Sequence, residues 1–257
     1  MNWLAEFLKI KFYMVTKDHG FVLTRHNFRE TSVIAQIFTL AHGKITGIFK
    51  GFYGIKKEFS TPLNLYTLNE FVFYPKKSEI WLMSFADIIK DYSFLRLDFE
   101  KAHTAAAMAH LINKVMPGWD PNKEIFGLYK ACMDYLDKGK DSQRAYYVFI
   151  IKFLTESGFK PEFNRCISCG EEISKNAFFS VKKGGIICDK CVNVYGDVRR
   201  ISHQAIACLR YIQKADLDTV WRLNINYACE EEILFVLRQF LVYHIDFDIM
   251  PERFCKV

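Results

Sequence analysis

Four cysteines in two pairs are the residues of this 257-residue chain whose types and spacing point most directly to chemistry. They follow the spacing Cys166-x2-Cys169-x18-Cys188-x2-Cys191. A tetrahedral zinc ion binds four thiolates at about 2.3 Å, and each Cys-x2-Cys turn can supply two of them. Gly170 directly follows the first pair, where a residue without a Cβ lets the backbone turn close to the sulfurs. The spacing therefore predicts one structural zinc ion per chain.

The segment between the two cysteine pairs has the pattern of a β-hairpin. Residues 178–181 are rich in strand-forming types, residues 182–185 (Lys-Lys-Gly-Gly) suit a turn, and residues 186–187 lead back to Cys188. This arrangement is a zinc ribbon. Four thiolates complete the coordination shell, whereas a catalytic zinc keeps a water ligand, so the sequence favours a structural role. The alternative is a set of four buried thiols without a metal.

A second group of residues is basic and aromatic and lies in the first third of the chain. Residues 1–85 hold eleven Lys or Arg against six Asp or Glu, whereas residues 86–162 hold eleven of each. A site for single-stranded DNA needs cations along the phosphate path and flat rings on which bases stack. The same pattern also suits a solvated charged face over an aromatic core. The candidate DNA-binding residues, which alternate with aromatic ones, are Arg25, Arg29, Lys44, Lys50, Lys56 and Lys57.

The elements that must position these residues change character near residue 86. Five short β-rich runs are expected at 21–24, 33–39, 45–49, 66–74 and 80–84. Five strands in a segment of this length favour a small closed barrel, of which the OB-fold is the commonest type. After Asp87, apolar residues recur at three- and four-residue spacing, which predicts three helices before Pro161 and more helices from Ser202 to His244.

The predicted fold class is therefore α+β, an N-terminal OB-fold β-barrel followed by a helical bundle with an inserted four-cysteine zinc module. The predicted domains are an OB-fold DNA-binding domain at 1–85, in which 1–13 is an unassigned extension, and a helical domain at 86–162. The zinc module is expected at 163–195, and C-terminal helices packed on the helical domain are expected at 196–257.

Composition and missing motifs narrow the possible functions. The chain is 51% hydrophobic and 25% charged, as in an ordinary globular protein. It holds neither a run of eighteen apolar residues nor a signal-peptide pattern, so we expect a cytoplasmic protein without a membrane partner. Phosphate-binding loops, nucleophile elbows and His-Glu-x-x-His pairs are missing, and no catalytic residue is predicted. We assign no function to the remaining cysteines, Cys132, Cys208, Cys229 and Cys255.

The order of these features is similar to that in the RecO family of bacterial recombinational repair proteins. The resemblance runs from about Gly20 to Cys191 and, more weakly, to about His244. It depends on the two cysteine pairs and on a series of short motifs: Val22-Leu23, Arg25, Glu30-Thr31-Ser32, Phe38-Thr39, Gly43-Lys44, Lys50-Gly51, Phe153-Leu154, Gly158, Pro161, Phe179-Ser180 and Gly184-Gly185.

The resemblance implies an OB-fold, a zinc-bearing helical domain and no catalytic turnover. Members of the family bind single- and double-stranded DNA and anneal complementary strands. They work with RecR, and often RecF, to load RecA onto DNA coated by single-stranded-DNA-binding protein. The basic run that often follows the Lys-Gly pair in the family is diluted here at residues 52–57, which predicts modest DNA affinity. Residues 246–253 lack the usual Gly-rich basic ending, so we assign them no function.

The expected function is that of a non-catalytic recombination mediator in the bacterial cytoplasm, associated with the nucleoid during repair. Its expected cofactor is Zn2+, and its expected partners are DNA and RecR, with RecF, RecA and single-stranded-DNA-binding protein as further candidates. On the helical domain, Lys114, Lys130 and Arg144 are candidates for receiving the acidic tail of a partner. One rival function is a zinc-stabilised protein-interaction adaptor that does not bind DNA directly. Another is a metal-dependent nuclease, which the lack of a carboxylate cluster disfavours.

Overall fold

The computed structural model describes residues 15–248 except for 55–58, 60, 76–77, 174–175 and 197. Lys56, Lys57, Cys255 and the expected extension at 1–13 therefore lie outside the described residues. The chain divides into two compact units. One comprises residues 1–91 together with 116–123, and the other comprises residues 92–115 together with 124–257.

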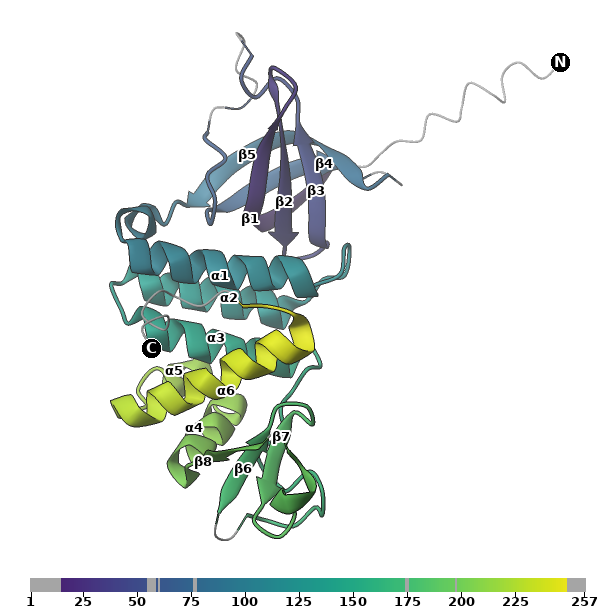
Figure 1. Ribbon diagram of the computed structural model, residues 1–257. Helices are drawn as coiled ribbons and strands as arrows, with labels where there is room; N and C mark the ends of the chain where they lie inside the picture. The colour runs from purple at the N-terminus through teal and green to yellow at the C-terminus, as the bar shows by residue number, and fades with distance from the viewer. Residues whose placement is uncertain are drawn as a thin grey trace, which may run out of the picture. The chain divides into compact units, whose positions relative to one another are not determined.

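The first unit is a closed β-barrel. Its strands are β1 (Thr16–Phe28), β2 (Ser32–Thr39), β3 (Gly43–Phe49), β4 (Leu68–Tyr74) and β5 (Ile80–Lys90). They close in the order β1-β2-β3-β5-β4, and all neighbouring pairs are antiparallel except β3 and β5, which are parallel (Figure 1). This is an OB-like barrel, so the fold class predicted for the N-terminal part is confirmed.

Strand β3 shows how the sequence pattern produces the barrel. Buried and half-buried residues alternate along its whole length, as expected when one face of a strand lies in a core. Its inward residues Ile45 and Phe49 join a core that also contains Phe71 and Met83. Gly47 is a further inward residue of β3. A Cβ at this position would lie 2.6 Å from the Met83 sulfur, so only glycine fits without a shift.

Strands β1 and β5 extend beyond the ranges that the sequence predicted. The outer half of β1, from Arg25 to Phe28, is exposed and pairs with β2 as a hairpin arm. An arm with solvent on both sides has no apolar alternation to mark it as a strand. Strand β5 continues to Lys90 and pairs with β4 over most of its length. The expected domain limit at residue 85 therefore falls inside β5.

The connection at residues 116–123 belongs to the barrel unit, although its neighbours in sequence are helices of the second unit. The backbone N–H of Trp119 donates to the carbonyl of Lys44 at 3.0 Å, and Gly118 forms an isolated β-bridge with Lys44. A Cβ on Gly43 would lie 2.3 Å from the carbonyl oxygen of Asp120. The segment therefore packs backbone to backbone on the start of β3.

The second unit is mainly helical. Helix α3 is its centre, because every residue from 145 to 151 is buried, and it contacts α1, α4 and α6. Asp141 caps α3 by accepting from the backbone N–H groups of Gln143 and Arg144, as an N-cap residue does. No helix in the described part of the chain is long and apolar enough to cross a membrane. The helical elements are η1 (Ser93–Leu97), α1 (Phe99–Val115), α2 (Lys123–Asp137), α3 (Ser142–Glu156), η2 (Val192–Val194), α4 (His203–Lys214), α5 (Leu217–Val220) and α6 (Tyr227–Ile245).

A three-stranded antiparallel sheet carries the cysteine segment. Strands β6 (Ala177–Ser180) and β7 (Gly185–Cys188) form the hairpin that the sequence pattern indicates, with Gly184 at φ +71° in the turn. A third strand, β8 (Val198–Ile201), pairs with the other edge of β6. The expected limit of the zinc module at residue 195 therefore excludes a strand of its sheet.

Candidate functional site

The four paired cysteines come together at one point of the second unit. Their sulfur atoms all lie within 4.8 Å of one another, and the sulfurs of Cys169 and Cys188 are 3.8 Å apart. Sulfurs bound tetrahedrally at about 2.3 Å from a zinc ion are about 3.8 Å from each other. No cysteine among the described residues forms a disulfide. The cluster could therefore hold a metal ion.

Backbone hydrogen bonds fold both Cys-x2-Cys turns around this point. In the first turn the N–H of Gly170 donates to the carbonyl of Cys166 at 2.8 Å, and Gly170 adopts φ +76°, a conformation that favours glycine. In the second turn the N–H of Cys191 donates to the carbonyl of Cys188 at 3.1 Å. The N–H of Cys188 also points at the sulfur of Cys166, at 3.4 Å. Each turn thus presents two sulfurs to the same space.

The electrostatics of the cluster favour one thiolate and oppose more of them. Burial disfavours the thiolate of Cys166, but the backbone N–H groups of Cys169, Cys188 and Ser168 outweigh burial and lower its pKa to about 6. At Cys169 the N–H of Glu171 favours the thiolate, yet desolvation and the other cysteine side chains raise its pKa to about 12. Several thiolates in this space therefore need a cation, and a bound metal ion would supply that charge.

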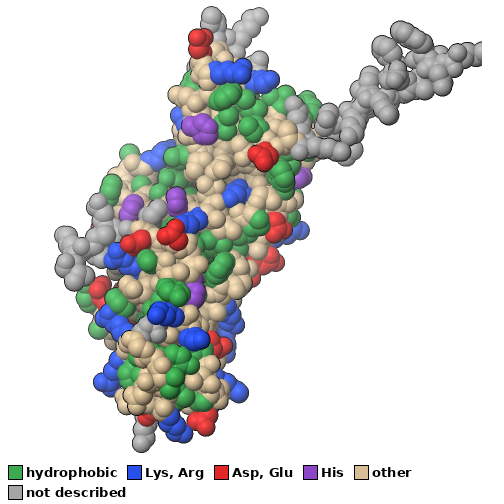
Figure 2. Space-filling view, turned by 45° about the vertical axis from the view of Figure 1, so that its right-hand side comes forward, with side chains coloured by type: hydrophobic (Ala, Val, Ile, Leu, Met, Phe, Trp, Pro, Cys, Tyr) green, Lys and Arg blue, Asp and Glu red, His purple; other side chains and the backbone are tan. Residues whose placement is uncertain are grey.

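Three of the candidate DNA-binding residues gather at one end of the barrel. Arg25, on β1, donates to the carbonyl of Leu63 at 2.6 Å and to the hydroxyl of Tyr53 at 3.4 Å. Arg29 lies in the turn between β1 and β2, and its guanidinium is 5.2 Å from the ring centroid of Phe28. Lys50 follows β3 directly and is exposed. On the barrel, at the top of Figure 2, Lys and Arg side chains lie beside hydrophobic ones.

Lys44 lies at the opposite end of β3, about 20 Å from Lys50 at roughly 3.3 Å per residue. It is half-buried and faces outward, like Thr46 and Ile48. Partial burial lowers the pKa of its ammonium group. The structure therefore does not bring the described candidate DNA-binding residues together in one patch, and Lys44 and Lys50 lie at opposite ends of β3.

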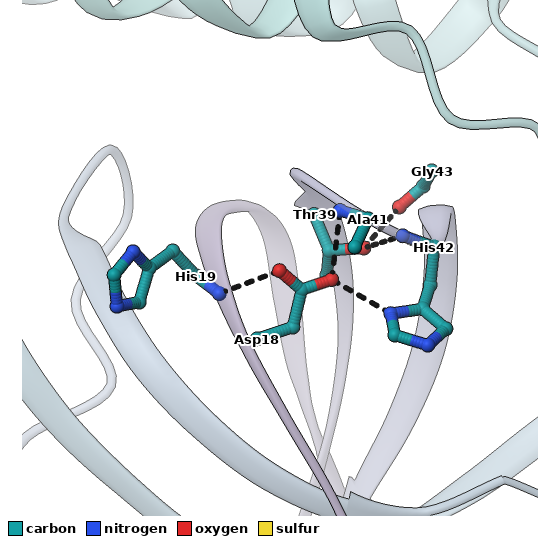
Figure 3. Close-up of polar contacts among 6 residues, drawn as sticks. All are labelled: Asp18, His19, Thr39, Ala41, His42 and Gly43. Carbon is teal, nitrogen blue, oxygen red and sulfur yellow. Dashed lines mark hydrogen bonds and ion pairs between the residues drawn. The ribbon is translucent and has the colours of Figure 1, made fainter.

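A buried carboxylate holds the turn from which β3 begins (Figure 3). Asp18 accepts from the backbone N–H of Ala41 at 2.9 Å and from Nδ1 of His42 at 2.7 Å. Thr39 donates to the carbonyl of Gly43 at 2.8 Å and accepts from the N–H of His42 at 3.2 Å. The imidazole also meets the ring of Phe73 edge-on, at a centroid distance of 5.3 Å. These contacts fix the position of Gly43 and hence of Lys44.

The candidate partner-binding residues lie on three different helices, and each one contacts a group of its own unit. Lys114, at the end of α1, donates to the backbone carbonyl and the carboxylate of Asp246. Lys130 pairs with Asp134 at 2.9 Å, one turn further along α2. Arg144 donates to the carbonyl of Trp221 at 3.3 Å. Trp119 is an exposed aromatic residue beside Lys44, and no pattern in the sequence marks it as a site residue. Only its place after Pro117-Gly118 could have drawn attention to it.

Comparison with known proteins relates both units of the chain to one protein family. The family model described as "Recombination protein O N terminal" matches residues 14–92, and the one described as "Recombination protein O C terminal" matches residues 96–250. Several curated relatives are named "DNA repair protein RecO". That of Alkaliphilus metalliredigens is 26% identical over 234 residues, which cover 91% of this chain and 95% of the relative. That of Caldicellulosiruptor bescii is 30% identical over 175 residues, which cover 68% and 71%.

Proposed function

Since the chain belongs to the RecO family of DNA repair proteins, we propose that it is a non-catalytic recombination mediator of the bacterial cytoplasm. It binds single- and double-stranded DNA, anneals complementary strands and, with RecR and RecF, helps to load RecA onto strands coated by single-stranded-DNA-binding protein. The observation that carries the proposal is the match of family models to both units of the chain. A mediator acts by holding strands and proteins together, so it needs affinity rather than a catalytic group.

DNA binding is assigned to the barrel. The supporting observations are the excess of basic residues in 1–85, the outward side of β3, and the aromatic contacts of Arg25 and Arg29. Strands and loops of OB-folds commonly bind oligonucleotides on this kind of surface. Lys56 and Lys57 stay candidates from sequence alone. The candidates for binding a partner's acidic tail are still Lys114, Lys130 and Arg144. Such a tail would have to compete with the contacts that these side chains make within their own unit.

The cysteine cluster is assigned to one structural zinc ion. Four cysteine sulfurs that lie within 4.8 Å of one another are the ligand set of structural zinc sites. The ion would tie the turn that contains Cys166 and Cys169 to the end of β7 and the turn that follows it. It takes part in no reaction step.

Strand annealing in solution tests the mediator function. Two complementary labelled oligonucleotides should pair faster with the protein than without it, and without ATP. Coating the strands with single-stranded-DNA-binding protein should leave the acceleration intact. As a matched pair, Lys50→Gln should slow annealing, whereas Lys140→Gln should not, because Lys140 is an exposed residue of the helical unit. A protein that binds DNA but neither accelerates annealing nor associates with RecR would contradict the mediator function. An adaptor without DNA affinity would show association with RecR alone.

A further inference from the structure

A small hollow on the barrel unit combines an aromatic ring, a cation and a carboxylate. Its volume is about 310 Å3, and it is lined by Lys44, Thr46, Glu79, Gly118 and Trp119. Lys44 and Thr46 come from the outward side of β3, and Glu79 directly precedes β5, whose first residue pairs with Thr46. Gly118 and Trp119 come from the connection that packs on β3. All five residues belong to the barrel unit.

Trp119 is held in an unusual conformation at the edge of this hollow. Its φ of +59° lies in the left-handed region, where a bulky residue is uncommon. The backbone around it is fixed by the hydrogen bond to Lys44 and by the contact between Gly43 and Asp120. The side chain nevertheless stays 49% exposed. Strained residues that the neighbouring structure holds in place cluster at ligand sites. Trp119 is such a residue, and its large ring is exposed to solvent.

The chemistry of the lining residues fits one unstacked nucleobase. An indole ring offers a flat surface on which any base can stack. The ammonium group of Lys44 can contact the adjoining phosphate. The hydroxyl of Thr46 and the carboxylate of Glu79 can accept hydrogen bonds from N–H groups at the edge of a base, the ring N–H of thymine included. A purely electrostatic site for the DNA backbone would gain nothing from Glu79, because a carboxylate repels phosphate.

We propose that Trp119, Lys44, Thr46 and Glu79 form a base-binding pocket for single-stranded DNA. The proposal rests on the assignment of DNA binding to the barrel and names a site within it. The pocket lies at the start of β3, and the cluster of Arg25, Arg29 and Lys50 lies at the other end of the strand. A single strand that follows the outward side of β3 thus meets cations and exposed aromatic rings at both ends, Trp119 at one and Phe28 and Tyr53 at the other.

Substitution of Trp119 in the full-length protein tests whether its ring stacks on a base or only supports the fold. Trp119→Gly removes the ring and suits the left-handed backbone, so its Tm should equal or exceed that of the parent protein. Its affinity for a labelled oligothymidine should nevertheless fall roughly tenfold to a hundredfold, the effect of losing one stacked base. Trp119→Phe should keep most of the affinity. The slope of log affinity against log salt should stay unchanged in both variants, whereas Lys44→Gln should reduce it by about 0.7, the value for one phosphate of a single strand.

Tryptophan fluorescence gives a second readout. The matched control is Tyr227→Ala, because Tyr227 is an exposed aromatic residue on α6 of the other unit. Oligothymidine should quench the emission of the parent protein and of Tyr227→Ala, but quench Trp119→Phe much less. Unchanged affinity of Trp119→Gly, or an equal loss in Tyr227→Ala, would overturn the pocket. If Arg25→Gln and Lys50→Gln still weaken binding in that case, DNA binding by the barrel stands. A parent protein without affinity for DNA at low salt would overturn both proposals.

Discussion

At the scale of single residues, Cys188 links the two halves of the four-cysteine cluster. Its sulfur lies near that of Cys169, and its backbone N–H points at the sulfur of Cys166. Cys188→Ser keeps the backbone contact but removes one thiolate. We expect zinc content to fall well below one ion per chain and stability to drop, because structural zinc contributes on the order of 10 kcal/mol in small modules.

Elemental analysis and urea unfolding measure these two effects. Cys132→Ala is the control, because Cys132 is fully buried in α2 away from the cluster. It should lower stability through the lost packing while leaving one zinc ion per chain. Folded Cys188→Ser protein with full stability and no change in metal content would show that the cluster is not a zinc site.

The lowered pKa of Cys166 makes the metal-free protein sensitive to pH. A thiol whose pKa is about 6 in the folded chain and about 8.5 in the unfolded chain stabilises the fold fully above pH 8.5, and this contribution is lost as the pH falls to about 6. We therefore expect the urea midpoint of chelator-treated protein to decrease over this range. Cys166→Ser, which has no ionisable thiol at this position, should lack that part of the decrease.

At the scale of elements, the length of β5 decides at which residue the chain can be truncated to give a folded barrel fragment. The strand runs to Lys90 and pairs with β4 up to Leu68, and Ala86 is part of the barrel core. A fragment that ends at residue 85 loses half of a wall strand. We expect it to be insoluble or unfolded, whereas a fragment that ends at residue 91 should show a cooperative thermal transition.

The connection at 116–123 adds a second requirement to this experiment. The fragment that ends at residue 91 leaves the backbone of Gly43 and Lys44 uncovered, so its Tm should lie below that of the barrel in the full chain. Circular dichroism on both fragments measures the difference. Equal stability of the fragments ending at 85 and 91 would show that the outer half of β5 contributes nothing to the barrel.

At the scale of the whole molecule, the four-cysteine cluster and the proposed DNA site belong to different units. Removal of the metal should therefore destabilise the helical unit without changing DNA affinity of the barrel. Fluorescence anisotropy with labelled single-stranded DNA, before and after chelation under conditions in which the protein stays folded, tests this independence. Both the affinity and its salt dependence should stay constant. A loss of binding on chelation would place the DNA site in the metal-bearing unit.

The sequence by itself determined the features that depend on neighbouring residues. The four-cysteine cluster, the β6–β7 hairpin, the number of barrel strands and the main helices could all be predicted, because a ligand pair, a turn or an amphipathic face is written within a few positions. Family membership followed from the order of such local features, and the comparisons confirm it.

Only the tertiary structure decided the features that depend on residues far apart in the chain. The exposed arm of β1 and strand β8 are strands because β2 and β6 pair with them, and nothing in their own pattern marks them. The separation of the candidate DNA-binding residues is also a property of the tertiary structure. They lie in one stretch of the sequence, but β3 places Lys44 and Lys50 at two ends of the barrel. The backbone of Trp119 contacts that of Lys44, which lies 75 positions earlier in the chain, so this contact closes a long loop. Contacts of that range leave no periodic signal in a single sequence, because their partner is specified elsewhere in the chain.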